Sequence, residues 1–153
     1  MIYNGWTISK ELYACIKDTL SSGIILELGS GEGTKLLCES YTVHSIEHNP
    51  QWIGYAESNY IHAPIRQYPD YKWYDIDKLG FLPDYDLLLV DGPTGSIGRW
   101  GFYKNIGLFN TDVPIILDDT HRPEEKLLAE VLAFEFQKEL TEYGTDKKFT
   151  VLK

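Results

Sequence analysis

The sequence has no uninterrupted apolar stretch of about 18 residues, the length that a membrane-spanning helix needs. It also has no basic segment followed by an apolar one, which is the pattern of a secretory signal. Its two cysteines, Cys15 and Cys38, lack the spacing of a CxxC motif or a metal site, and neither has a histidine beside it. We therefore expect a cytoplasmic protein without a membrane segment, in which both thiols are structural.

Basic residues are also scarce, with 14 Lys and Arg against 23 Asp and Glu and a formal net charge of −9. The field of such a chain repels phosphate backbones unless basic residues cluster locally. The only adjacent basic pair is Lys147-Lys148, which we assign to a solvated turn near the end of the sequence. We expect no nucleic-acid partner and a small molecule instead.

The length and composition are those of one ordinary globular domain. The chain has 153 residues, of which 43% are hydrophobic and 24% charged, and no stretch of biased composition suggests a linker. We therefore predict a single domain over residues 1–153.

Apolar runs alternate with amphipathic segments along the chain. Thr7 or Ser9 is the expected cap of the first helix, and Asn49 with Pro50 the expected start of the third. The predicted strands are 23–28, 41–47, 64–67, 85–91 and 113–119, with a last strand or hairpin in 145–152, and the predicted helices are 9–20, 32–39, 50–59, 100–108 and 123–140. This alternation predicts a Rossmann-like α/β fold, with a doubly wound, mostly parallel sheet and helices on both faces.

Acidic residues recur where the predicted strands end. Glu27, Glu47, Asp91 and the pair Asp118-Asp119 all lie at or near the carboxyl ends of apolar strands. In an open parallel sheet these ends surround the crevice in which ligands bind, at the point where the strand order reverses. We expect the five carboxylates to face one site.

A glycine-rich turn follows the first predicted strand. Gly29, Gly31 and Gly33 give the spacing G-x-G-x-G, whereas a dinucleotide fingerprint has its third glycine in the sixth place, where this chain has Thr34. Glu27 and Glu32 flank the turn, so it suits a cationic ligand better than a pyrophosphate. An NAD(P)-binding oxidoreductase remains the alternative interpretation.

An acidic residue followed by G-x-G-x-G resembles the first motif of the class I S-adenosylmethionine-dependent methyltransferases. The resemblance implies that the glycines pass close to the methionyl part of the cofactor and that Glu47 accepts hydrogen bonds from both ribose hydroxyls. It places the adenine near His48 and near the segment 74–76. The cofactor-binding residues that it implies are Glu27, Gly29, Ser30, Gly31, Gly33, Glu47, His48, Asp75 and Asp91.

The later acidic residues resemble a second pattern of that family. Catechol-type O-methyltransferases hold magnesium with an acidic residue after the fourth strand and an Asp-Asn pair after the fifth, where this chain has Asp91 and Asp118-Asp119. Asp119 departs from the pattern, because Asn is usual there. The resemblance implies a Mg²⁺ site at these three residues. The alternative is that Asp119 caps the helix near Pro123 and Asp118 merely ends a strand.

Without a metal ion, other side chains have to serve the methyl acceptor. Asp91, Asp119 or His121 is then the candidate base. Arg99 and Arg122 either bind an anionic group of the substrate or form ordinary ion pairs. The many aromatic residues fit a core, a homodimer interface or a ring-binding pocket equally well.

The resulting hypothesis is a transfer of a methyl group from S-adenosylmethionine to an oxygen or nitrogen of a small molecule. Besides the oxidoreductase, a non-catalytic module that only binds the cofactor is an alternative, because the chain is short for the family and has no evident lid.

Overall fold

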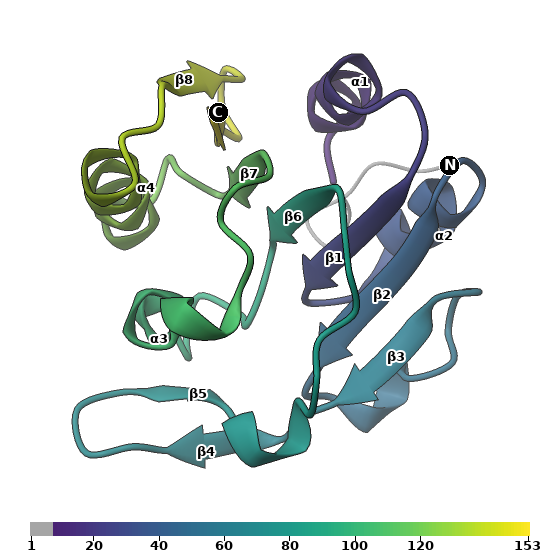
Figure 1. Cartoon of the computed structure of the whole chain (residues 1–153), viewed down its shortest axis with the longest axis vertical. Helices are drawn as coiled ribbons and strands as arrows, with labels where there is room; N and C mark the ends of the chain where they lie inside the picture. Colours follow the sequence, from purple (N-terminus) through teal and green to yellow (C-terminus); the bar gives the residue numbers. More distant parts are fainter. Residues whose placement is uncertain (1–7) are drawn as a thin grey trace.

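The computed structural model describes residues 8–153. They contain a seven-stranded sheet with the order β3-β2-β1-β6-β7-β9-β8 (Figure 1). Five neighbouring strands pair in parallel, and β9 pairs antiparallel with β7 and β8. The strands are β1 (Ile24–Leu28), β2 (Thr42–Glu47), β3 (Asn59–His62), β6 (Leu87–Val90), β7 (Ile115–Asp118), β8 (Leu140–Tyr143) and β9 (Phe149–Leu152). The predicted, mostly parallel sheet is confirmed.

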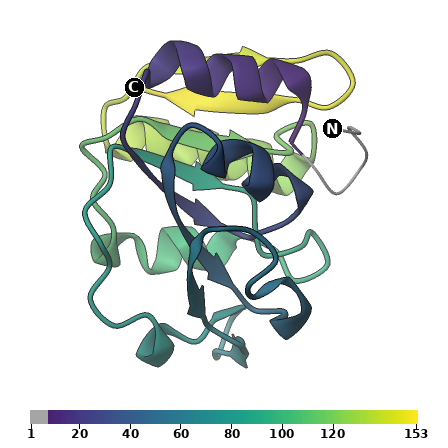
Figure 2. The ribbon, with the colours of Figure 1, turned by 90° about the vertical axis from the view of Figure 1, so that its right-hand side faces the viewer.

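Helices cover both faces of this sheet. Helices α1 (Lys10–Thr19) and α2 (Glu32–Cys38) lie on one face, and α3 (Trp100–Lys104) and α4 (Pro123–Glu135) lie on the other (Figures 1 and 2). Leu12 of α1 and Leu128 of α4 are each buried in a separate apolar cluster against the strands. The fold is therefore the expected doubly wound, Rossmann-like one. Within residues 8–153, none of the helices has the length and apolar character to cross a membrane.

Helices α1 to α4 all begin where expected, and α1 and α4 show the start signals most clearly. The Ser9 hydroxyl caps α1 by accepting a hydrogen bond from the Leu12 N–H at 3.1 Å, and the other candidate, Thr7, lies outside the described residues. Helix α4 begins at Pro123, with two glutamates in its first turn. It ends at Glu135 rather than at residue 140, because Gln137 adopts a φ of 52° and residues 140–143 pair as β8.

The predicted helix over residues 50–59 is wrong. The Asn49 side chain does accept a hydrogen bond from the Gln51 N–H at 3.0 Å, but only the single 3₁₀ turn Pro50–Trp52 follows. The chain then turns at Gly54, and residues 59–62 form β3 in parallel register with β2. The free backbone groups along β2 favour this pairing, which a local helix pattern does not reveal.

The third strand of the sheet is therefore β3, and the strand predicted at 64–67 belongs elsewhere. It is β4 (Ile65–Gln67), which pairs antiparallel with β5 (Lys72–Tyr74) in a separate hairpin. The 3₁₀ turn Ile76–Lys78 leads from this hairpin toward β6. The predicted helix at 100–108 is divided into α3 and the 3₁₀ turn Ile106–Leu108.

Strands β1 and β6 are neighbours, yet the chain leaves them toward opposite edges of the sheet. At this switch point Gly29 has a φ of 88°. A Cβ atom on Gly29 would lie 2.8 Å from the Asp91 carbonyl oxygen and 2.9 Å from the Gly92 Cα. Only glycine satisfies both the backbone conformation and this close approach of two loops.

Replacement of Gly29 by alanine should therefore destabilise the fold by about 2 to 4 kcal/mol, combining the strain of a positive φ with overpacking against backbone. Gly54→Ala is the matched control, because Gly54 also has a positive φ, of 81°, but has open space around its Cβ position. It should cost only the strain, about 1 kcal/mol. Urea unfolding measures both values, and equal losses would show that the contact at Gly29 contributes nothing.

Candidate functional site

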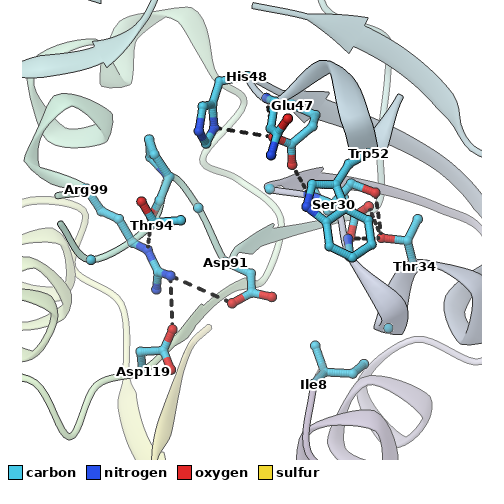
Figure 3. Close-up of a pocket in the computed structure, with 18 of the residues that line it drawn as sticks. Ile8, Ser30, Thr34, Glu47, His48, Trp52, Asp91, Thr94, Arg99 and Asp119 are labelled. Carbon is cyan, nitrogen blue, oxygen red and sulfur yellow. Dashed lines mark hydrogen bonds and ion pairs between the residues drawn. The ribbon is translucent and has the colours of Figure 1, made fainter. Parts of the chain in front are cut away.

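A cavity of about 580 Å³ opens at the carboxyl ends of β1, β2, β6 and β7. Its volume lies within the usual range for small-molecule sites. Figure 3 shows His48, Glu47 and Trp52 at one end, Arg99 and Asp119 at the other, and Asp91 between them. The predicted site residues that line it are Glu27, Gly29, Ser30, Gly31, Gly33, Glu47, His48, Asp91 and Asp119.

Three other predicted residues do not line this cavity. Asp75 caps the 3₁₀ turn that follows β5, with its Oδ1 accepting from the Asp77 N–H at 3.1 Å, and it pairs with Arg66. His121 is exposed, and its Nδ1 faces the Lys148 N–H at 3.3 Å. Asp118 is buried beneath the cavity, at 1% exposure. The structure thus supports neither Asp75 as an adenine contact nor His121 as a base.

Glu27 lies at the bottom of the glycine turn and is almost fully buried, at 3% exposure. Its Oε2 accepts hydrogen bonds from the Thr34 hydroxyl at 2.7 Å and the Ser45 hydroxyl at 2.5 Å. Burial raises the pKa of Glu27 to about 7, although both hydroxyls oppose the shift. A cationic ligand beside this carboxyl group would stabilise its ionised form, which burial disfavours.

Glu47 joins the two loops that follow β1 and β2. Its Oε1 accepts from the Ser30 N–H at 2.8 Å, and its Oε2 accepts from the Asn49 N–H at 2.7 Å and lies 3.3 Å from the His48 Nδ1. These bonds fix the carboxylate at the cavity wall. Since a carboxylate has about four acceptor positions, it keeps capacity for a ligand with two hydroxyl groups.

Tyr74 is a site residue that the sequence indicated only through its place beside Asp75. It comes from β5, is fully buried and lines the cavity. Its hydroxyl has no hydrogen-bond partner among residues 8–153. Burial raises the pKa of Tyr74 well above its usual value, so the hydroxyl stays a neutral donor. A buried polar group without a partner is costly, and a bound ligand would supply the partner.

Arg99 organises the opposite end of the cavity. It is 4% exposed and donates hydrogen bonds to the Asp119 carboxylate at 2.9 Å and to the carbonyls of Pro93 and Asp118. Its Nη2 also lies 3.8 Å from Asp91 Oδ1. Arg99 is therefore an ion-pair partner rather than a substrate clamp.

The Asp91 side chain keeps 27% of its surface accessible and lines the cavity. Desolvation, followed by the negative charge of Asp118, raises the pKa of Asp91 well above its usual value, and Arg99 opposes this shift. Such a carboxyl group is a stronger base than an ordinary aspartate.

Lys147 lies in the turn between β8 and β9 and lines the cavity. Its Nζ is 3.1 Å from Asp118 Oδ2 and 3.9 Å from Asp119 Oδ1. Burial disfavours the ammonium, but the charges of Asp118 and Asp91 outweigh it and raise the pKa of Lys147. Lys147 does lie in the expected turn, with 31% of its side chain exposed, but its contact with Asp118 was not predicted, because no local pattern shows what the turn faces.

The predicted Mg²⁺ ligands do come together. Asp91, Asp118 and Asp119 each offer a carboxylate oxygen, and these atoms lie within 4.8 Å of one another. However, Lys147 and Arg99 already compensate Asp118 and Asp119, and a divalent ion bound to Asp118 Oδ2 would lie beside the Lys147 ammonium. The residues in this arrangement do not fit the metal ion.

The sequence matches no protein-family model and no curated protein. Solved structures do match. The C-terminal domain of a precorrin-6Y C5,15-methyltransferase from Rhodobacter capsulatus has a TM-score of 0.63 and 10% identity, over 98% of this chain and 90% of that one. A putative caffeoyl-CoA O-methyltransferase from Staphylococcus aureus has a TM-score of 0.63 and 14% identity, over 97% and 86%.

A third match is the Podospora anserina methyltransferase bound to S-adenosylhomocysteine, with a TM-score of 0.55 and 15% identity over 85% of this chain and 70% of that one. The chain has the fold of the class I S-adenosylmethionine-dependent methyltransferases. The names of proteins with this methyltransferase fold range from precorrin to tRNA methyltransferases, so the likeness does not identify the acceptor.

The buried Glu27 should make the stability of this methyltransferase fold depend on pH. Glu27 has a pKa of about 7 in the folded chain against an ordinary 4.5, so the folded state holds a proton that the unfolded state loses. Stability is then highest below the lower value and falls as the pH rises through this window, by up to about 3 kcal/mol. Glu27→Gln should remove this loss of stability, because glutamine does not ionise.

Urea unfolding between about pH 5 and pH 8 measures the difference between wild type and Glu27→Gln. The variant should gain stability relative to wild type as the pH rises. Glu130→Gln, on the exposed face of α4, is the control and should follow wild type. A constant difference for Glu27→Gln across the range would contradict a raised pKa.

Proposed function

We propose that this protein transfers the methyl group of S-adenosylmethionine to an oxygen or nitrogen of a small molecule. The observation that carries the proposal is a single cavity that joins the glycine turn and Glu47 to the carboxylates of Asp91 and Asp119. The end of the cavity at the glycine turn and Glu47 suits the methyl donor. The end at Asp91 and Asp119, which we call the acceptor end, suits the group that receives the methyl. The fold shared with methyltransferases supports the same conclusion.

The charges at the glycine turn favour this cofactor over a dinucleotide. Glu27 lines the cavity, and a cationic ligand would offset the cost of ionising it. A pyrophosphate would instead bring its negative charge up to this carboxyl group. Glu47, with two backbone N–H groups holding it in place, is the acceptor for the ribose hydroxyls.

In the proposed reaction the nucleophile attacks the methyl carbon opposite the sulfonium. The new O–C or N–C bond forms as the S–C bond breaks, its electron pair stays on sulfur, and the product is S-adenosylhomocysteine. A protonated acceptor must also lose its proton, for which Asp91, with its raised pKa, is the candidate base. The main contribution of the protein is to hold the two reactants about 3 Å apart and in line.

A cavity of about 580 Å³ in a chain of net charge −9 favours a small acceptor. The polyanionic backbone of a nucleic acid would meet this negative field, and three of the basic residues near the cavity are engaged with carboxylates.

Titration with S-adenosylhomocysteine should raise the melting temperature of the protein, whereas NAD and NADP should not. Glu47→Gln should weaken this binding by about 10- to 100-fold, because one acceptor oxygen of the charged group is lost. Glu39→Gln, an exposed glutamate at the end of α2, is the control and should bind as wild type does.

Stabilisation by NAD or NADP alone would replace the proposal by an oxidoreductase. Binding of S-adenosylhomocysteine combined with failure of wild type to methylate any member of a broad acceptor panel would favour a non-catalytic module.

The unpartnered Tyr74 hydroxyl yields a separate prediction. Tyr74→Phe should weaken binding of S-adenosylhomocysteine by about 2- to 10-fold, while leaving the free protein equally or more stable, because a buried group without a partner is removed. Tyr85→Phe is the matched control, since the Tyr85 hydroxyl is bonded to the Asn110 backbone at 2.6 and 3.0 Å and lies outside the cavity.

Calorimetric titration and urea unfolding should therefore separate the two tyrosines. Tyr85→Phe should lose stability and keep its affinity for S-adenosylhomocysteine. If Tyr74→Phe behaves in the same way, the Tyr74 hydroxyl has no role in binding.

A further inference from the structure

Three cationic side chains converge on Asp119 at the acceptor end of the cavity. Arg99 Nη2 lies 2.9 Å and Arg122 Nη1 3.7 Å from Asp119 Oδ2, and Lys147 Nζ lies 3.9 Å from Asp119 Oδ1. Asp119 itself has a φ of 63°, which is uncommon for a residue other than glycine.

Lys147 differs from the two arginines in what holds it. Its shorter ion pair within residues 8–153 is with Asp118, which is 1% exposed. The other oxygen of Asp118, Oδ1, accepts from the Asp119 N–H at 2.8 Å. Asp118 cannot turn away toward solvent, so the ammonium is kept at the cavity wall. The ammonium group of lysine is a compact point charge, so among side chains it most resembles a bound metal cation.

Without Lys147, the acidic cluster would be undercompensated. Asp91, Asp118 and Asp119 carry three potential negative charges within 4.8 Å, and Arg99 supplies one full hydrogen-bonded ion pair, to Asp119. Arg122 is shared between Asp119, at 3.7 Å, and Glu125, at 4.0 Å. Hard oxygen ligands gathered this closely are the usual partners of a divalent cation. The Lys147 ammonium lies 3.1 Å from Asp118 Oδ2 and 3.9 Å from Asp119 Oδ1, so it would strongly repel a divalent cation bound to these two oxygens.

We propose that Lys147 is the built-in cation of this cluster and takes the place of a divalent metal ion, so that the acceptor end of the cavity works without one. That a methyl acceptor binds at this end of the cavity rests on the proposed function. That Lys147 excludes a divalent metal ion there does not. In the proposed reaction the Lys147 charge faces the oxygen of the acceptor, which favours acceptors with an acidic hydroxyl or a carboxylate.

Mn²⁺ alone, titrated into the full chain and followed by electron paramagnetic resonance, tests the proposal without cofactor or acceptor. Wild type should show at most weak binding. Lys147→Ala and Lys147→Met should each bind one Mn²⁺ at least about tenfold more tightly, because removal of the ammonium frees Asp118 and Asp119. Asp118→Asn in the Lys147→Ala background should abolish the gained binding.

Lys148→Ala is the matched control. Lys148 is the next residue in the chain, but its Nζ pairs with Glu142 at 3.0 Å and it does not line the cavity. This variant removes the same charge from the chain and should bind Mn²⁺ as wild type does. Thermal melting identifies any variant that does not fold, and the Met variant keeps the aliphatic part of the side chain.

Tight binding of Mn²⁺ by wild type would overturn the proposal, as would an equal gain in Lys147→Ala and Lys148→Ala. Neither result depends on whether S-adenosylhomocysteine binds. Failure of this inference and failure of the proposed function are therefore distinguishable.

Discussion

The backbone of Gly29 lies against that of Asp91 and Gly92, and the arrangement of the site depends on this contact. It brings together the loops that follow β1 and β6, the two neighbouring strands from which the chain departs in opposite directions. The Asp91 N–H donates to the Leu28 carbonyl at 2.9 Å, which continues the strand pairing up to the contact. As a result the glycine turn and Asp91 border one cavity.

The carboxylates around this cavity owe their different properties to their partners. Glu27 is bonded to hydroxyl groups and buried, which raises its pKa, whereas Glu47 is held by backbone N–H groups of two loops. Asp118 and Asp119 face Lys147 and Arg99. One functional group, the carboxylate, thus provides an anchor for a cationic ligand, an acceptor of hydrogen bonds and a cluster with its own cations.

Much of the fold could be predicted, because the strands at the centre of the sheet are short apolar runs that are buried on both faces whatever surrounds them. The edge strand β3 was harder to predict from the sequence. Residues 59–62 have no strong pattern of their own and become β3 by pairing with β2. The site was predicted best where residues adjoin a strand end, and worst where a side chain arrives from a remote turn or hairpin, as Lys147 and Tyr74 do.

The sequence by itself determined the doubly wound sheet, the glycine turn and the acidic residues at the strand ends, because these features follow from local apolar runs and from spacing along the chain. The tertiary structure alone decided the partners of those residues. It set Asp75 and His121 apart from the cavity, and it brought Lys147 to within 3.1 Å of Asp118 across 29 positions in the chain. The physical reason is that pKa, charge compensation and ligand fit depend on distances through space, which no local pattern specifies.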